Sequence, residues 1–210
     1  ENLGMAANVH RNILAIDKKT HKNMPIDNHI ELFSNKVVGE KNRFMDSVSN
    51  QMFLRVDTDS YHSCGQLPDL ESYDAVVVSD YDKGFLSDAD LQEIGERSII
   101  SFLDTKKRHN ADWANLYDFI KINDKEAREN GWDRSAANLI ITKAGRGCSF
   151  GKKDFPIRTP AEVRDVAGAG DTFLAAFSYT FMLTKDIYSS ILYAQDCCQT
   201  VISKKGVVTI

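Results

Sequence analysis

From about residue 75 onwards, short apolar runs alternate with polar helical stretches, and this alternation constrains the fold more than any other feature. One run spans Ala75 to Val78, and similar runs occur in "SIISFLDTKK", "DFIKIND" and "NLIITKAGRG", each followed by a polar turn. Between the first two runs, "SDADLQEIGERS" begins with an N-cap residue, Ser87, and acidic residues, which predicts a helix. Buried strands that alternate with helices favour a mostly parallel sheet covered on both faces. The sequence therefore predicts an α/β fold.

The first 60 residues are more mixed. Apolar residues at Ala6, Val9, Ile13 and Ile16 follow helical spacing, which predicts an N-terminal helix. The segments "NKVVGEKNRFMD" and "SNQMFLRVDTD" are predicted as strands. The 210 residues contain no internal repeat or low-complexity linker, and 42% of them are hydrophobic, so we predict one domain over residues 1–210.

Composition argues against several kinds of partner. A formal net charge of −4 gives no electrostatic footprint for nucleic acid or for an anionic membrane surface. No apolar run approaches the roughly 18 residues that a membrane-spanning helix needs. The four cysteines form no C-x-x-C pair, which argues against a zinc site or a disulfide framework. Reduced thiols of this kind are typical of a cytoplasmic protein.

Polar residues stand at the end of each predicted strand of the central region. They are Asp80, Asp104, Asn123 and Thr142. In open α/β sheets, ligands bind outside the carboxyl ends of the strands. We therefore expect these four side chains to lie around a binding site at one edge of the sheet.

The segment "DVAGAGD", from Asp165 to Asp171, stands directly before the apolar run "TFLAAF". If a helix begins here, its first backbone N–H groups are free to bind an anion, and glycines allow a phosphate to approach closely. Asp171, in the first turn, could then accept a proton from a hydroxyl that attacks the phosphate. The alternative is an N-terminal cap combined with a tight helix–helix contact that needs small residues.

This segment resembles the C-terminal signature of the PfkB/ribokinase family of sugar kinases, which is close to D-T-x-G-A-G-D. Val166 stands where the family has Thr. The resemblance implies a ribokinase-like fold with a small β lid, here within residues 33–60, and an ATP-dependent kinase that uses Mg²⁺. It also implies Asp171 as the catalytic base, with the amides of Gly168, Ala169 and Gly170 as an anion hole.

Three further segments resemble the nucleotide side of these kinases. "NDKE", which comprises Asn123, Asp124, Lys125 and Glu126, fits the N-x-x-E motif that organises Mg²⁺ and phosphates, with Asn123 and Glu126 nearest the metal. Alone, this pattern is a common helix cap. "ITKAGRG" resembles the strand and turn beside the nucleotide, with Thr142, Lys143 and Gly147 as contacts. It is also typical of a glycine-rich hairpin turn leading to residues 148–151, and the two interpretations are compatible. "CCQTVISKKGVVTI" resembles the last helix and strand beside the adenine, with Gly206 ending the helix.

One branch of the family fits better than the others. "VVVSDYDKGFL", "KNRF", "NQMFLRVD" and "FLDTKK" resemble segments of the D-glycero-β-D-manno-heptose-7-phosphate kinases, whose product leads to ADP-heptose and the lipopolysaccharide core. The match assigns six residues to the phosphosugar side, namely Lys41, Arg43, Gln51, Arg55, Asp80 and Lys83. Arg and Lys suit a sugar that already carries a phosphate, and the alternative for each is a solvated surface side chain. "LGMAANV" resembles the G-G-x-x-N motif, so Gly4 and Asn8 would face the sugar, unless they only begin a helix.

Compared with the family, the chain begins late, because the usual first strand and its sugar-binding aspartate have no counterpart before Glu1. We expect a kinase with one activity, acting on a small-molecule sugar phosphate and possessing no nucleotidyltransferase domain. Pairing of lid strands between two subunits would give a homodimer. Two alternatives remain: a related kinase for another sugar or a nucleoside, and a truncated, non-catalytic protein that binds a nucleotide or a sugar.

Overall fold

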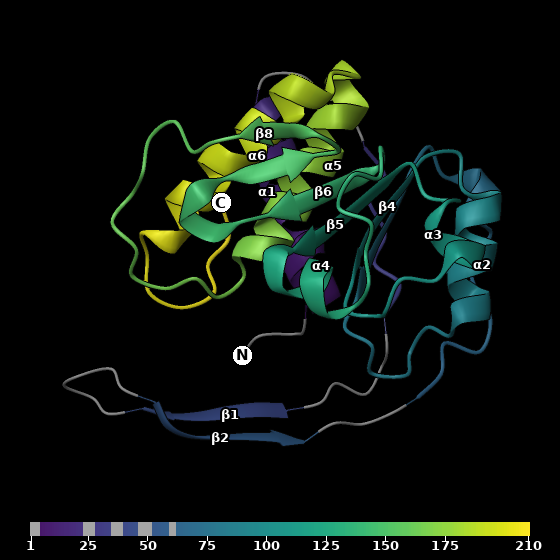
Figure 1. Cartoon of the computed structure of the whole chain (residues 1–210), viewed down its shortest axis with the longest axis horizontal. Coiled ribbons are helices and arrows are strands. Elements are labelled where there is room, and N and C mark those ends of the chain that lie inside the picture. The colour runs from purple at the N-terminus through teal and green to yellow at the C-terminus, as the bar shows by residue number, and fades with distance from the viewer. Residues whose placement is uncertain (1–4, 23–27, 35–39, 46–51, 59–61) are drawn as a thin grey trace.

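Six strands form the central sheet, in the order β3-β4-β5-β6-β7-β8 (Figure 1). The structure, a computed structural model, describes residues 5–22, 28–34, 40–45, 52–58 and 62–210. The strands are β3 (Val76–Asp80), β4 (Ser101–Thr105), β5 (Phe119–Asn123), β6 (Leu139–Thr142), β7 (Cys148–Phe150) and β8 (Lys153–Phe155). Neighbours from β3 to β6 are parallel, and β7 and β8 add antiparallel strands. The predicted α/β fold with a mostly parallel sheet is confirmed.

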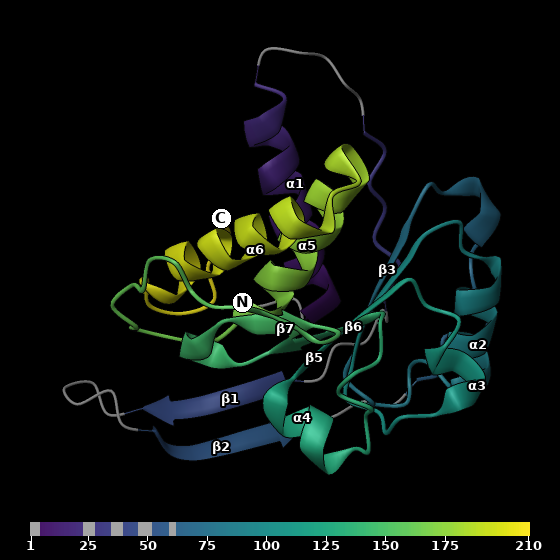
Figure 2. The ribbon, with the colours of Figure 1, turned by 45° about the horizontal axis from the view of Figure 1, so that its top comes forward.

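Helices cover both faces of this sheet (Figure 2). One face carries α1 (Met5–Thr20), α5 (Ala169–Thr184) and α6 (Ile187–Ile202), and the other carries α2 (Asp88–Arg97), α3 (Ala111–Ala114) and α4 (Asp124–Glu129). Short 3-10 turns, η1 (Leu70–Ser72) and η2 (Ala144–Arg146), lie in the connections. The predicted cap of α2 is confirmed, because the Ser87 hydroxyl accepts the Asp90 N–H while the Asp90 carboxylate accepts the Ser87 N–H.

Successive residues of the strands enter two separate cores. Phe102 belongs to the core under α1, α5 and α6, whereas Leu103 belongs to the core under α2 and α3. In the first core the ring of Phe119 stacks on that of Phe102, at 5.3 Å between centroids. Phe177 and Phe181 of α5 contact Phe119 edge-on, at 5.1 Å and 4.6 Å. Strand alternation thus sends one set of side chains to each face, and α5 is held tightly along the sheet.

Two of the segments predicted as strands form an antiparallel ribbon of their own. β1 (Glu40–Met45) pairs with β2 (Met52–Thr58), and the ribbon lies apart from the central sheet in both views (Figures 1 and 2). The strand prediction for this region is therefore confirmed. The N-terminal helix predicted from residues 6 to 16 is also confirmed, as α1.

The C-terminal segment differs from the prediction. α6 ends at Ile202, so Gly206 does not end the helix, and residues 207–210 form no strand. Gly206, with φ +76°, instead donates its N–H to the Asp165 carboxylate at 3.1 Å. The Ile210 N–H donates to Oδ1 of Asn12 at 3.1 Å. Asp165 thus binds the N–H at the predicted helix end, and Asn12 binds an N–H that the predicted strand would have used, so the C-terminal segment lies across α1 and the loop before α5.

No helix in the described part of the chain combines the length and the apolar character needed to cross a membrane.

Candidate active site

The polar residues at the strand ends meet at one edge of the sheet, as expected. Asp80 pairs with Thr105 at the ends of β3 and β4, and Asn123 pairs with Thr142 at the ends of β5 and β6. Asp104 lies one residue from the end of β4. Parallel pairing brings these ends together, because each strand starts from the same side of the sheet.

The loop before α5 exposes backbone donors at this edge. Gly168 has φ +80°, a conformation that favours glycine, and a Cβ there would lie 3.0 Å from Nδ2 of Asn8. The Asp165 carboxylate fixes the loop by accepting the N–H groups of Ala167, at 2.9 Å, and Gly206. One part of the expected anion hole is not available, because the Ala169 N–H donates to the Val166 carbonyl at 3.2 Å.

The remaining amides are those of Gly168, Gly170 and Asp171. Within the described residues none of these three N–H groups has an acceptor, as is usual for donors in the first turn of a helix. The start of α5 therefore presents amide donors and the positive end of a helix dipole, a combination that binds anions.

Asp171 lies in the first turn of α5 with no exposed surface. Its Oδ2 accepts a hydrogen bond from Nδ2 of Asn8 at 2.8 Å, and its Oδ1 lies 3.4 Å from the Tyr81 hydroxyl. Burial raises the pKa of the Asp171 carboxyl to about 6, and the charge of Asp104 adds to this rise, whereas Asn8, Lys121 and Tyr81 oppose it. A carboxylate with this pKa can take a proton near neutral pH.

Lys121 and Asp104 form a buried ion pair next to Asp171, and the sequence reading missed the lysine. The Lys121 Nζ lies 2.6 Å from Oδ2 of Asp104, and both side chains are buried. Burial opposes charge on Lys121, yet Asp104 and the neighbouring carboxylates Asp171 and Glu126 raise its pKa, so the lysine is an ammonium. The available signal was a single lysine inside the otherwise apolar strand "FIKIN". Tyr81, which lies in the segment "SDYDKG", was also not assigned a role.

The N-x-x-E segment forms the helix cap that was its alternative interpretation. Oδ1 of Asn123 accepts the Glu126 N–H, and Oε2 of Glu126 accepts the Asn123 N–H, both at 2.9 Å. Oε1 of Glu126 accepts a hydrogen bond from Lys106 at 2.8 Å. Burial would raise the pKa of Glu126, but the Asn123 N–H and Lys106 hold it below its usual value. Lys125 is exposed, 3.9 Å from Glu129.

Three arginines surround the side chain of Asp124. Its carboxylate oxygens lie 2.6 Å from Arg128, 2.8 Å from Arg134 and 3.4 Å from Arg146, and these guanidinium groups, Arg134 first, hold its pKa below the usual value. The Asp124 carboxylate is therefore already paired with arginines of the protein itself.

The oxygens of Asn123 and Glu126 do not form a complete Mg²⁺ site of their own. In the described part of the chain, no three His, Cys, Asp or Glu side chains converge as a metal site would require. Both carboxylate oxygens of Glu126 already accept protein donors. Mg²⁺ keeps several waters and often takes only one or two protein carboxylates together with substrate phosphates. The donor set therefore fits an ion held mainly by phosphates and water, with Asn123 and Glu126 at its outer edge.

The turn after β6 lies at the same edge of the sheet. The Thr142 hydroxyl donates to the Ile122 carbonyl at 3.3 Å, and Lys143 forms an ion pair with Asp154. Gly147 has φ +91°, and a Cβ there would lie 2.1 Å from the Phe155 carbonyl oxygen. The hairpin interpretation of Gly147 therefore holds, because the backbone crosses too closely for any side chain.

Of the residues predicted for the sugar side, Asn8 contacts Asp171, whereas the Asp80 carboxylate accepts hydrogen bonds from the protein itself. The Asp80 carboxylate accepts the Thr105 hydroxyl at 2.9 Å and the Asp82 N–H at 3.0 Å, so it shapes the loop that carries Tyr81 and Lys83. Burial raises the pKa of Asp80. Gly4 and Gln51 lie outside the described residues. Lys41 and Arg43 lie on β1, and Arg43 pairs in register with Arg55 of β2; the structure describes the backbone of these three residues.

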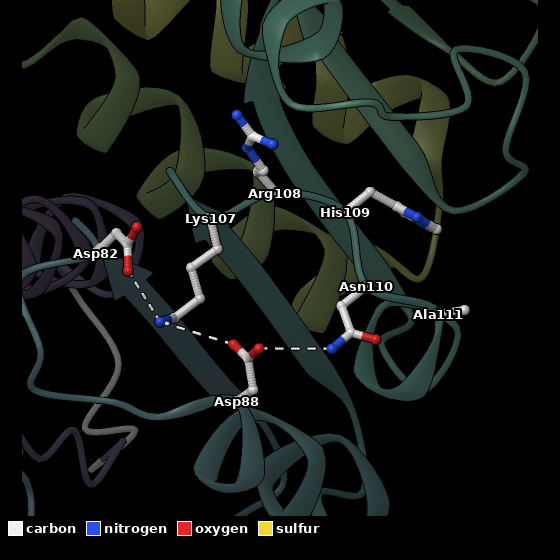
Figure 3. Close-up of a pocket in the computed structure, with 7 residues that line it drawn as sticks. All are labelled: Asp82, Asp88, Lys107, Arg108, His109, Asn110 and Ala111. Carbon is white, nitrogen blue, oxygen red and sulfur yellow. Dashed lines mark hydrogen bonds and ion pairs between the residues drawn. The ribbon is translucent and has the colours of Figure 1, made fainter.

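A cavity of about 540 Å³ opens between the loops that follow β3 and β4 (Figure 3). It is lined by Asp82, Asp88, Lys107, Arg108, His109, Asn110 and Ala111. The Lys107 ammonium lies 2.9 Å from Asp82 and 3.7 Å from Asp88, so two carboxylates face it. None of the predicted site residues lines this cavity, and its acidic and basic side chains are balanced in number. It therefore adds no preference for an anion.

Comparison with known proteins connects this geometry to a family. A family model described as "pfkB family carbohydrate kinase" matches residues 93–210, which contain β4, β5, β6 and the whole of α5. The chain belongs to the pfkB family of carbohydrate kinases. The start of α5, with Asp171 in its first turn, lies within the matched region.

Solved structures of other kinases share the fold of this pfkB-family chain. A ribokinase from Thermotoga maritima superposes with a TM-score of 0.68 over 97% of this chain and 82% of its own, at 15% sequence identity. An Arabidopsis thaliana ribokinase, complexed with ribose and ATP, gives a TM-score of 0.65 over 96% of this chain and 80% of its own, also at 15% identity. These likenesses confirm the ribokinase-like fold.

Curated relatives of this pfkB-family chain include several named "Bifunctional protein HldE". The protein of that name from a Nitratiruptor species is 27% identical, with 85% of this chain and 44% of that protein covered. The one from Campylobacter curvus is 28% identical, with 99% of this chain and 54% of that protein covered. The chain spans about half the length of the curated relatives it matches.

Proposed function

We propose that this chain catalyses ATP-dependent phosphorylation of a sugar phosphate, heptose 7-phosphate, at its anomeric hydroxyl, giving heptose 1,7-bisphosphate. The observation that carries the proposal is the buried Asp171 at the start of α5, beside amides without an acceptor among the described residues. The branch-specific segments around residues 41–55 and 76–86, together with the relatives named HldE, support the choice of acceptor.

In this proposal each group at the start of α5 has one task. Asp171 takes the proton of the acceptor hydroxyl while that oxygen bonds to the transferred phosphorus and the bond from phosphorus to the ADP oxygen breaks. Asn8 orients the Asp171 carboxylate through their 2.8 Å hydrogen bond. The amides of Gly168, Gly170 and Asp171 donate to the phosphoryl oxygens. The contribution of these residues is positioning and electrostatics.

ATP with Mg²⁺ supplies the phosphoryl group and part of the charge neutralisation when it is bound. We propose that the nucleotide lies along two stretches at the edge of the sheet, residues 123–126 and 142–147. The remaining lone pairs of the Asn123 and Glu126 oxygens would accept hydrogen bonds from waters of the metal ion. Gly206 would contribute indirectly, since its N–H fixes Asp165 and through it the loop before α5.

A panel of acceptors tests the substrate. ADP release is measured with heptose 7-phosphate, fructose, ribose and a nucleoside, each with Mg·ATP. Heptose 7-phosphate is expected to give the highest kcat/KM. If it is not phosphorylated while an unphosphorylated sugar is, the chain is a kinase for a different acceptor and the heptose assignment is wrong.

The role of the base is tested by Asp171→Asn with a matched control. Asp196→Asn removes an exposed carboxylate that only pairs with Arg158 on the surface. We expect Asp171→Asn to lower kcat by roughly 10²- to 10⁴-fold, the usual contribution of a general base, and the control to leave it unchanged. If both proteins turn over the acceptor at the same rate, Asp171 is not the base. If both bind ATP and neither phosphorylates any acceptor, the chain is a nucleotide-binding protein and not a kinase.

Two further features of the proposal concern the setting of the enzyme. We propose a cytoplasmic location, where ATP is available; the four cysteines are free thiols, which suits a reducing compartment. We also propose a homodimer formed through the β1–β2 ribbon, because this ribbon carries exposed apolar side chains and its outer edges pair with no other strand among the described residues.

A further inference from the structure

Lys121 is a buried cation in the middle of the sheet that the roles given above do not use. It lies on β5 directly opposite Asp104 of β4, and the two side chains are only 7% and 11% exposed. An ammonium loses its hydration in such a place, and replacing a buried ion pair by apolar residues is often neutral or even stabilising. Stability is therefore a weak reason for the pair, which points to a functional one.

The ammonium lies directly beside the start of α5. A Cβ built on Gly170 would be 2.9 Å from Nζ of Lys121, so the absence of a side chain at residue 170 leaves the space that the ammonium needs. Lys121 and Asp104 lie on the same sheet face as Phe119 and Phe102, whose rings contact Phe177 of α5. The pairing of β4 with β5 thus places the Lys121 ammonium beside the start of α5, while the aromatic side chains fix α5 against the sheet.

The ammonium has capacity left to interact with a ligand. It carries three N–H donors, and within the described residues it donates only one hydrogen bond, to Asp104. Three carboxylates gather here, namely Asp104, Asp171 and Glu126, against the two ammonium groups of Lys121 and Lys106. Without Lys121 the local charge would be −2, and it would repel an incoming phosphoryl group.

We propose that Lys121, held in place by Asp104, supplies the positive charge that balances the transferred phosphoryl group at the start of α5. The inference rests on the proposed kinase reaction. While the acceptor oxygen bonds to phosphorus, the ADP oxygen leaves and Asp171 takes the proton, Lys121 stabilises the negative charge on the phosphoryl oxygens beside Gly170. Its effect belongs to the transfer step more than to binding of either substrate, so it should appear in kcat more than in KM.

Three single variants test this role. Lys121→Met removes the charge and keeps a side chain of similar length, whereas Lys121→Arg keeps the charge. Lys152→Met removes an exposed lysine of the β7–β8 turn and serves as a control. We expect Lys121→Met to lower kcat by roughly 10²- to 10³-fold, the usual effect of removing one group that stabilises a transition-state charge. KM for both substrates should change far less, Lys121→Arg should recover part of kcat, and the control should match wild type.

Lys121→Met leaves the Asp104 carboxylate buried without a partner and could unfold the protein, so a neutral pair is needed. The double variant Asp104→Asn, Lys121→Met removes both charges, and its melting temperature should be close to that of wild type. Its kcat should still be low. Binding of ADP alone should be retained, whereas binding of ADP with aluminium fluoride and the acceptor, which imitates the phosphoryl group in transfer, should weaken at least tenfold.

The outcomes separate this inference from the proposed function. A wild-type chain without turnover on any acceptor would overturn both. An active wild type whose folded double variant is equally active, with unchanged binding of ADP–aluminium fluoride, would overturn the role of Lys121 and leave the kinase assignment intact. A parallel increase in both KM values with unchanged kcat would assign Lys121 to substrate binding and would also contradict the inference.

Discussion

Asp171 must be ionised to act as a base, yet it is placed where ionisation is unfavourable. It has no exposed surface, and Asn8, Lys121 and Tyr81 favour its charged form. A pKa of about 6 is the balance of these effects, and it leaves most of the carboxylate ionised at neutral pH. Both the rate and the stability of the protein should therefore depend on the titration of this residue.

The first prediction concerns the pH dependence of turnover. Because the base must be ionised, kcat should fall as the pH decreases through about 6. The measurement is kcat with saturating Mg·ATP and acceptor between pH 5 and 8. A rate that stays constant down to pH 5 would contradict a base with this pKa.

The second prediction concerns stability. The pKa of Asp171 is higher in the folded protein, about 6, than its ordinary value of 3.8, so the folded state binds the proton more tightly than the unfolded state does. The stabilising effect of that proton is present below pH 4 and is lost as the pH rises through about 6. The ionised carboxylate therefore costs of the order of 3 kcal/mol at neutral pH. Asp171→Asn should unfold at higher urea concentration than wild type at pH 8, and the difference should shrink towards pH 5. A variant less stable than wild type at pH 8 would contradict this account.

At the scale of elements, the hairpin between β6 and β7 depends on one backbone crossing. Gly147 has φ +91°, and the Phe155 carbonyl leaves no space for a side chain there. Gly145, two residues earlier, has no atom within 4 Å of a built Cβ. The same turn thus contains a glycine that is required and one that is not.

The third prediction uses this pair. Gly147→Ala should destabilise the protein by at least about 1–3 kcal/mol, since φ +91° with ψ −137° is a backbone conformation nearly confined to glycine and the clash adds to its cost. Gly145→Ala should change the free energy of unfolding little. Urea unfolding of the two variants measures the difference, and equal stability of the two would show that the crossing relaxes at no cost.

At the scale of the whole molecule, the β1–β2 ribbon stands apart from both cores. Phe44 pairs in register with Leu54, and both are 54% exposed; Val56 lies on the same face of the ribbon and is also exposed. An isolated two-stranded ribbon is marginally stable in water. A second copy of the chain would cover these side chains.

The fourth prediction is therefore that the protein is a dimer at micromolar concentration. Light scattering during gel filtration should give twice the chain mass of 23.6 kDa. The double variant Phe44→Ser, Leu54→Ser should be a monomer. Ile99→Ser, which removes an apolar side chain that is 62% exposed elsewhere, should stay dimeric. A monomeric wild type, or a dimeric ribbon variant, would contradict the prediction.

The parts of the site that could be predicted are those with a local signal. The run "DVAGAGD" identified the glycine-rich start of α5, and the strand ends identified the edge of the sheet, because both depend on residues adjacent in sequence. Lys121 carried a weaker local signal: a single lysine in an otherwise apolar strand still resembles a surface residue until its partner on the next strand is known. The prediction for the C-terminal segment was wrong for a related reason. Asp165 accepts the N–H of Gly206, which was predicted to end the last helix, and Asn12 accepts the N–H of Ile210, which was predicted to lie in a strand; both acceptors are distant in sequence.

The sequence by itself determined the order of strands and helices and the segment that begins α5, because apolar periodicity and glycine placement act over a few residues. Only the tertiary structure decided the chemistry of the base. Asn8 reaches Asp171 across 163 positions of the chain, and Asp104 and Lys121 meet through the pairing of two strands. Burial, which raises the pKa of Asp171, is a property of the assembled core, and no local pattern of residues contains it.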